Sequence, residues 1–311
     1  MSHVIRLVIA TALFALALPA AETLPNFQNV KRVVFLGDSI TYSGQYIETI
    51  EAYHATHFPE QQIEFLNLGL PSETVSGLSE DGHAGGKFPR PELRERRDRV
   101  LTKTKPDLVI ACYGMNDGIY LPFSVERFQK FTNGIVELRK AVAAAGAKII
   151  HVTPPTFDEV KGGHPGYDAA LDRYSDWLLA QRAAGWDVAD VHGPMNQYLA
   201  DQRKRDPEFF LAKDGVHCGD TGQWIIAKQI LQHLGAKDVA KFDDVAAMVA
   251  SHPNGAEILK LVQEKQRLLK DAWLADAGHK RPGMKRGLPL AEAQVQAKEL
   301  DERLARLKNQ K

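Results

Sequence analysis

The stretch Val33–Ile40, with the sequence VVFLGDSI, indicates how this chain folds. An apolar run of β-branched and aromatic residues ends at Gly37, and a helical pattern of apolar residues begins near Tyr46. This order indicates a buried strand that stops at the carboxyl edge of a sheet, with Ser39 at the start of the next helix. Free backbone N–H groups and the positive end of the helix dipole at such a position suit a nucleophile. The same stretch also fits a simple turn in which Asp38 or Ser39 caps the helix.

Short apolar runs alternate with longer amphipathic ones from residue 31 to about residue 234. This alternation is typical of a parallel sheet with helices on both faces. Right-handed crossovers bring the carboxyl ends of such strands to one edge, where ligands bind. We therefore predict an α/β domain over residues 28–236. The expected strands are 32–36, 63–67, 107–112, 147–152 and 186–190, and the expected helices lie near 44–56, 91–103, 124–145, 167–184, 194–202 and 220–234.

The composition changes from about residue 237, where Lys, Arg, Glu, Ala and Leu become dominant. Apolar residues recur at helical spacing over Ile258–Trp273 and again over Ala293–Leu307, and Pro289 stands in a good position to start the second helix. We expect a helical C-terminal extension over residues 237–311, either packed on the α/β domain or tethered to it. Its basic loop, residues 278–287, fits a solvated turn, and it also fits a segment that reaches over the active-site edge to bind an anionic glycan.

The first 21 residues have the pattern of an export signal. His3 and Arg6 precede an apolar segment over Leu7–Leu18, and small residues suited to cleavage follow it. This apolar segment is short for a membrane span, and no later stretch is long enough to cross a bilayer. We therefore expect residues 1–21 to be a signal peptide. The mature protein is then expected in the periplasm or outside the cell, without a stable membrane span.

Charge and cysteine content exclude several classes of protein. The 311 residues carry 39 basic and 39 acidic side chains, so the net charge is about zero and gives no general attraction to nucleic acid or anionic membranes. The two cysteines, Cys112 and Cys218, are too few for a disulfide scaffold or a metal-ligand cluster. They fit a disulfide in an exported protein, and Cys112 equally fits a small buried position. The sequence gives no indication of the oligomeric state.

Three further segments place polar groups after predicted strands or before the last helix of the domain. Gly69 follows the second strand, where a glycine lets the backbone approach a ligand and present its N–H group. Asn116 follows the third strand, and its amide is suited to bind a developing oxyanion. Asp214 and His217 are three residues apart, so one turn can supply a histidine and the carboxylate that fixes its tautomer. Taken singly, each segment also fits an ordinary turn or cap.

Together these segments resemble a known family. Gly37–Ser39, Gly69, Gly114–Asp117 and Asp214–His217 are similar, in order and approximate spacing, to the four blocks of the SGNH (GDSL-type) hydrolases. The resemblance covers residues 31–234. It implies a three-layer α/β/α sandwich with a five-stranded parallel, flavodoxin-like sheet, and hydrolysis of acyl esters without a metal or cofactor. The Gly-x-Ser-x-Gly elbow of the other large serine-esterase fold is absent.

The resemblance also implies roles for individual residues. Ser39 is then the nucleophile, His217 the general base and acid, and Asp214 the carboxylate that orients His217. The oxyanion hole is expected to comprise the Ser39 N–H, the Gly69 N–H and the Asn116 side-chain amide. Two neighbouring carboxylates are expected to support these loops rather than to react: Asp38 and Asp117.

The substrate is less directly indicated. The chain resembles exported bacterial members of the family that carry a similar helical tail, which implies removal of acetyl groups from carbohydrate. Two loops at the edge of the expected site, 82–90 and 153–167, are poor in aliphatic residues and do not form an evident lipid-binding lid. The alternatives are a lipase or lysophospholipase-type acylhydrolase, and a catalytically silent glycan-binding protein on the same scaffold.

Overall fold

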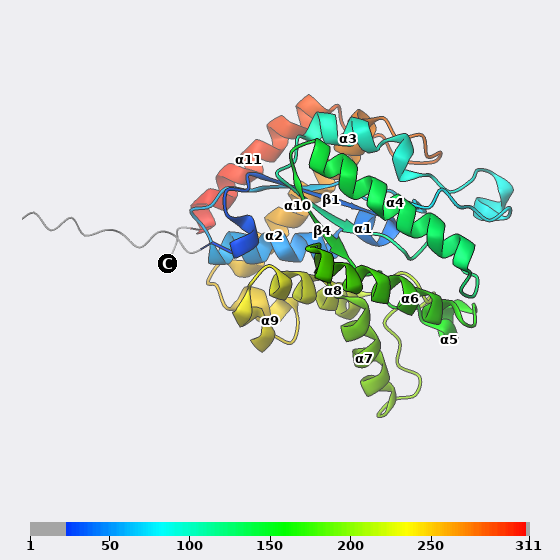
Figure 1. Cartoon of the computed structure of the whole chain (residues 1–311). Coiled ribbons are helices and arrows are strands. Elements are labelled where there is room, and N and C mark those ends of the chain that lie inside the picture. The colour runs from blue at the N-terminus through cyan, green and yellow to red at the C-terminus, as the bar shows by residue number, and fades with distance from the viewer. Residues whose placement is uncertain (1–22, 309–311) are drawn as a thin grey trace, which may run out of the picture.

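The computed structural model describes residues 23–308 and contains, within them, one sheet of five parallel strands (Figure 1). The strands run in the order β2-β1-β3-β4-β5, which is the flavodoxin-like order. They are rich in Val, Ile and Leu and are almost wholly buried, as expected for a sheet covered on both faces. The predicted α/β fold is confirmed. The strands are β1 (Arg32–Gly37), β2 (Glu64–Asn67), β3 (Leu108–Cys112), β4 (Lys148–Val152) and β5 (Asp187–Ala189).

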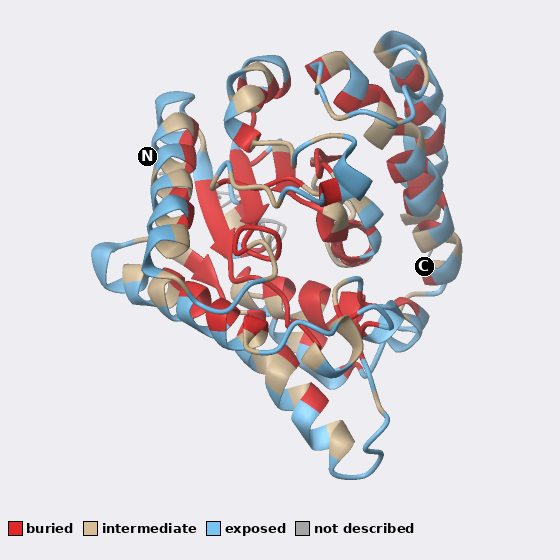
Figure 2. Cartoon of the chain, turned by 90° about the vertical axis from the view of Figure 1, so that its right-hand side faces the viewer, coloured by how far each residue is buried: buried red, intermediate tan, exposed pale blue. Residues whose placement is uncertain are grey.

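Helices cover both faces of this sheet. On one face α2 (Gln45–His57) packs against α8 (Asp220–His233). On the other face α4 (Val125–Ala144) packs between α3 (Arg97–Thr104) and α6 (Tyr167–Ala180). This distribution follows from right-handed crossovers, because the chain moves towards one edge of the sheet after β1 and towards the opposite edge after β2, β3 and β4. Figure 2 shows the buried sheet at the centre and helices with exposed outer faces around it.

Six further α-helices complete the part of the chain that the structure describes. They are α1 (Ser39–Ser43), α5 (Glu159–Gly162), α7 (His192–Arg203), α9 (Val245–Ala250), α10 (Gly255–Ala277) and α11 (Leu290–Lys308). The predicted signal peptide, residues 1–21, lies outside the described residues. Among residues 23–308, no helix is both long and apolar enough to cross a membrane.

The C-terminal helices pack on the α/β unit along its outer strand. Gln266 of α10 donates from Nε2 to the backbone oxygen of Phe65 in β2, at 2.8 Å. The same amide donates to Glu51 of α2, at 2.6 Å. Helix α10 thus supplies a hydrogen-bond donor to the backbone of β2, which is an edge strand of the sheet. An exposed edge strand can pair with strands of other molecules, and α10 covers this edge. Helix α11 in turn packs against α10.

Helix α10 and the basic loop also reach the end of the sheet that carries the nucleophile turn. Tyr42 of α1 donates its hydroxyl proton to Asp271 at 2.8 Å. Lys270 donates to the Tyr42 backbone oxygen at 2.8 Å and lies over the Tyr42 ring. In the basic loop, Arg281 donates from Nε to the Pro71 oxygen at 2.8 Å and lies over the ring of Phe88. The C-terminal part of the chain therefore contacts both the helix that begins at Ser39 and the loop that follows β2.

Candidate active site

The turn after β1 holds Ser39 at the first position of α1. Asp38 is buried and caps this helix, because its Oδ1 accepts the Ile40 N–H at 2.9 Å. A side chain at residue 37 would collide with Thr41 and the Cys112 backbone oxygen, so only glycine allows the turn to pack against β3. The Ser39 N–H donates to no acceptor among residues 23–308, so it is free to bind a ligand.

Ser39, His217 and Asp214 form a continuous hydrogen-bonded chain. The Ser39 Oγ and the His217 Nε2 are 2.7 Å apart, and the His217 Nδ1 and the Asp214 Oδ2 are also 2.7 Å apart. Because Nδ1 faces a carboxylate, it carries the proton, and Nε2 is left to accept the proton of Ser39. The structure thus brings together the three residues expected from the sequence.

The loop of Asp214 fixes its own geometry. The Asp214 Oδ1 accepts the backbone N–H groups of His217 at 2.8 Å and Val216 at 3.0 Å. Burial raises the pKa of Asp214, but the hydrogen bonds from the side chain and backbone of His217 outweigh it, so the pKa lies below its ordinary value. The carboxylate is therefore charged when His217 needs a negative partner. The side chains of His217 and Asp214 remain 53% and 56% exposed, so the site is open to solvent.

Asn116 lies in the loop after β3 and is almost fully buried. Its Oδ1 accepts two hydrogen bonds, from Arg90 Nη1 at 2.9 Å and from the Tyr120 hydroxyl at 3.0 Å. Its Nδ2 donates to the Glu73 backbone oxygen at 3.3 Å, which uses one of the two amide hydrogens. The second amide hydrogen has no acceptor among the described residues and is available to an oxyanion.

Asp117 ties the loop of Asn116 to the loop after β2. Its Oδ1 accepts the backbone N–H groups of Val75 and Ser76, both at 2.8 Å. Asp117 is fully buried, and this burial raises its pKa to about 6. Its contacts hold two loops of the site together and do not reach Ser39 or His217.

Gly69 differs from its expected role as an oxyanion donor. Its N–H donates to the side chain of Asn67 at 2.9 Å, so this hydrogen is already bonded within the fold. A side chain at residue 69 would collide with the backbone of Thr41 and Tyr42, so the glycine permits close packing of the β2 loop on α1. Three residues later Ser72 has a φ of 68°, and its N–H donates to no acceptor within residues 23–308. Ser72 is thus the available backbone donor in this loop, whereas Gly69 is not.

A buried ion pair between Arg96 and Glu73 holds the loop after β2 in place. Arg96 donates to Glu73 through two hydrogen bonds of 2.6 and 2.7 Å, and it also donates to the Leu68 oxygen at 2.7 Å. Tyr113 of the loop after β3 donates to the same Glu73 carboxylate at 2.7 Å. Both members of the pair are buried, with 1% and 0% of the side chain exposed. Neither residue was singled out in the sequence, because a lone Glu and a lone Arg 23 positions apart carry no pattern.

The two cysteines of the chain lie in the α/β domain. Cys112 and Cys218 are both buried free thiols, so the possible disulfide is not formed.

His192 contacts the Pro154 oxygen through Nδ1 and Asp172 through Nε2. Asp168, Asp172 and His192 together form a group whose ligand atoms all lie within 4.8 Å of one another. These hydrogen bonds account for His192 as a structural residue.

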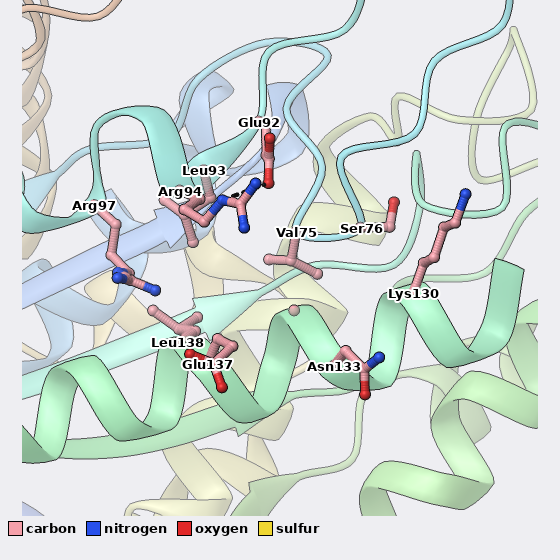
Figure 3. Close-up of a pocket in the computed structure, with 11 residues that line it drawn as sticks. Val75, Ser76, Glu92, Leu93, Arg94, Arg97, Lys130, Asn133, Glu137 and Leu138 are labelled. Carbon is pink, nitrogen blue, oxygen red and sulfur yellow. Dashed lines mark ion pairs between the residues drawn. The ribbon is translucent and has the colours of Figure 1, made fainter.

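A cavity of about 280 Å³ opens between α4 and the segment before α3 (Figure 3). Ser39, Asp214 and His217 do not contribute to it, so it is separate from the hydrogen-bonded chain described above. Its charged side chains pair with neighbours; for example, Arg94 contacts Glu92 at 3.2 Å. The lining residues are Val75, Ser76, Glu92, Leu93, Arg94, Arg97, Lys130, Asn133, Gly134, Glu137 and Leu138.

Asp38→Asn is expected to flatten part of the pH dependence of stability. Burial raises the pKa of Asp38 from 3.8 to about 7, although the Ile40 N–H opposes the shift. Between these values the native state holds a proton that the unfolded chain releases, so this group's contribution to the free energy of unfolding falls as pH rises from about 4 to about 7. Asparagine cannot ionise and still accepts the Ile40 N–H.

Urea denaturation of both proteins at about pH 5 and about pH 8 measures this effect. We expect the variant to gain stability relative to the wild type at the higher pH. The comparison between the two proteins cancels the contributions of titratable groups that do not interact with Asp38, and it keeps those of the charged groups that face it, namely Asp117, His217 and Arg90. An unchanged difference at the two pH values would contradict the prediction.

The α/β domain is similar to known proteins. Residues 35–225 match the model of the GDSL-like Lipase/Acylhydrolase family. No protein of curated function matches the chain. Among solved structures, Axe2, an acetylxylan esterase from Geobacillus stearothermophilus, has a TM-score of 0.51 at 21% identity, over 66% of this chain and 94% of that one.

Two further structures are similar. LAE5, an alpha/beta hydrolase enzyme from the metagenome of Lake Arreo, Spain, has a TM-score of 0.51 at 23% identity, over 66% of this chain and 95% of that one. BT4096, a gut microbial diltiazem-metabolizing enzyme, has a TM-score of 0.53 at 21% identity over 66% of this chain. The match spans only about half of BT4096, 47% of its length. At these identities the similarity shows a shared fold.

Proposed function

This chain belongs to the GDSL-like Lipase/Acylhydrolase family and is a carboxylic ester hydrolase, and from that premise we propose that it removes acetyl groups from carbohydrate through an acyl-enzyme. The observation that carries the proposal is the hydrogen-bonded chain from Ser39 through His217 to Asp214, with 2.7 Å at each step. A serine hydroxyl is a weak nucleophile unless an adjacent base removes its proton, and this chain supplies such a base.

The reaction proceeds in two halves. His217 Nε2 takes the proton of Ser39 as Oγ attacks the ester carbonyl, and Asp214 stabilises the imidazolium that forms. The imidazolium then protonates the leaving alkoxide, so the alcohol departs and the acyl group stays on Ser39. In the second half His217 takes a proton from the water that attacks the acyl-enzyme, and it then returns this proton to the Ser39 Oγ as the carboxylic acid leaves.

The tetrahedral intermediates need donors for their negatively charged oxygen. We assign this role to the Ser39 N–H, the Ser72 N–H and the free amide hydrogen of Asn116. Each belongs to a different loop at the carboxyl edge of the sheet, and each lacks an acceptor among residues 23–308. Such fixed donors stabilise charge that develops only in the transition state, so they accelerate the chemical step.

Two observations favour a small acyl group on a large alcohol. The side chains of His217 and Asp214 are more than half exposed, so an ester on the surface of a polymer can reach Ser39 without entering a deep channel. One structural neighbour of this chain is described as an acetylxylan esterase. An enzyme for long acyl chains is expected to provide a concave apolar site instead.

The acyl preference is tested with acetyl, butyryl and octanoyl esters of one alcohol, together with an acetylated xylo-oligosaccharide. We expect kcat/KM to fall by about tenfold or more from acetyl to octanoyl, because the proposed open site leaves much of the longer chain exposed to water. We also expect release of acetate from the oligosaccharide. A preference for the octanoyl ester would favour the lipase-type alternative. Failure of a fluorophosphonate to label Ser39 would favour a silent glycan-binding protein.

A further inference from the structure

The amide of Asn116 is held in one orientation from its oxygen side. Asparagine oxygen and nitrogen are nearly the same size, so the hydrogen-bond partners decide which of them faces the substrate. Here the Oδ1 accepts from Arg90 at 2.9 Å and from Tyr120 at 3.0 Å. The Arg90 guanidinium can only donate and the Tyr120 hydroxyl donates here, so the Asn116 oxygen, and not its nitrogen, must face them. The Nδ2 group is therefore directed away from them, towards Glu73 and the site.

Arg90 is itself rigidly placed. Its Nε and Nη2 donate to the two oxygens of Glu80 at 2.7 and 2.6 Å, a forked ion pair that fixes the guanidinium plane. Its backbone N–H donates to the Ser79 hydroxyl at 3.0 Å. The Arg90 side chain is only 7% exposed and lies over the ring of Tyr120. The one remaining terminal nitrogen, Nη1, is then directed at Asn116.

This arrangement has an electronic consequence as well as a geometric one. A cation bonded to the oxygen of an amide draws electron density from its nitrogen, which makes the N–H groups better donors. The effect is strongest when the pair is shielded from water, as it is here. A positive charge behind Asn116 also favours negative charge on the other side of the amide, where the oxyanion forms.

We propose that Arg90 is a positioning residue for catalysis, which orients and polarises the Asn116 amide towards the oxyanion. The proposal rests on the ester hydrolysis put forward above, and it assigns a catalytic task to a loop that has no part in the hydrogen-bonded chain of Ser39. Residues 79–90 close on themselves through the Glu80–Arg90 pair and present Nη1 to Asn116. Tyr120 supplies the second hydrogen bond to the same oxygen.

A double-mutant cycle tests this coupling on a small acetyl ester. The variants are Arg90→Met, Asn116→Ala and the double variant, and the readouts are kcat and KM separately. We expect Arg90→Met to lower kcat by about 10- to 100-fold with KM changed by less than about threefold, because the lost stabilisation belongs to the transition state. In the Asn116→Ala background we expect the same change to lower kcat by less than about threefold, since the amide through which it acts is gone.

A structural role alone predicts a different result. If Arg90 only held its loop in place, Arg90→Met would lower kcat by equal factors with and without Asn116, and this additive outcome would overturn the proposal. Tyr120→Phe provides a second test, which can be carried out even if the Arg90→Met variant does not fold. It removes the other donor to Oδ1, so its smaller loss, about 3- to 10-fold, is also expected to vanish in the Asn116→Ala background.

Two controls separate this inference from the proposed function. Arg94→Met removes a comparable but exposed cation from the same region, and we expect it to leave kcat unchanged. The small acetyl ester makes the result independent of whether carbohydrate is the substrate. A wild-type protein that hydrolyses no ester would reject both the function and the role of Arg90, whereas an active wild type with additive losses would reject only the latter.

Discussion

Ser39→Ala is expected to lower kcat for acetyl-ester hydrolysis by a factor of about 10⁴ or more. The substitution removes the only oxygen that the His217 Nε2 contacts in the hydrogen-bonded chain, so no acyl-enzyme can form. Asp214 and His217 keep their mutual contact, since it lies within a single turn of the chain. The fold is expected to remain, because the Asp38 cap and the close packing of Gly37 do not depend on the serine hydroxyl.

The measurement is the rate of acetate release, paired with labelling by a fluorophosphonate. Wild-type protein is expected to react with one equivalent of the probe, and Ser39→Ala with none. Ser251→Ala is the matched control, since Ser251 directly follows α9 and its hydroxyl bonds, within residues 23–308, only to the nearby Met248 oxygen. Retention of more than about one hundredth of the wild-type rate by Ser39→Ala would show that another group is the nucleophile.

Arg96→Met is expected to lower the free energy of unfolding by about 3–5 kcal/mol, which is large for a single substitution. Methionine fills much of the space but leaves Glu73 buried without its cationic partner. The free carboxylate must then stay charged in an apolar site or take up a proton. Burial raises the pKa of Glu73 even beside Arg96, whose charge opposes that shift.

Two further variants make this result specific. Arg94→Met breaks an exposed pair with Glu92 and is expected to cost less than about 1 kcal/mol. A double variant, Glu73→Gln with Arg96→Met, removes the uncompensated charge and is expected to recover part of the loss. Urea denaturation monitored by tryptophan fluorescence gives all four free energies. A loss for Arg96→Met no larger than that for Arg94→Met would contradict a structural role of the buried pair.

Local pattern was sufficient to predict most of the sheet and the ends of its strands. The runs that became β1 and β3 are rich in β-branched and other apolar residues; polar residues follow β1 directly, and Asn116 lies four positions after the end of β3. Polar groups on different strands meet because parallel strands end at one edge. The meeting of Ser39 with the Asp214–His217 turn follows from this topology, although 178 residues separate Ser39 from His217.

Features that depend on the direction of individual side chains could not be predicted from the local sequence pattern. A glycine after β2 suggested a backbone donor, but the Asn67 side chain bends back and takes the Gly69 N–H. The free N–H belongs to Ser72. Its positive φ could not be predicted, because serine rarely adopts this backbone conformation and nothing in the local sequence indicates it. The expected helix near 91–103 is broken, with a single 3₁₀ turn at Leu93–Glu95 before α3. The arginine between these two pieces, Arg96, is the one that turns inward to Glu73.

The contact between Tyr42 and Asp271 joins the helix that begins at Ser39 to a part of the chain that is synthesised much later. These residues are 229 positions apart, so Tyr42 gains this partner only after synthesis has passed residue 271. The contact of Arg281 with the Pro71 oxygen spans 210 positions and has the same property. A nascent chain that has completed all five strands still lacks these two braces. A chain that terminates before residue 271 is therefore expected to contain the residues of all five strands but neither of these two contacts.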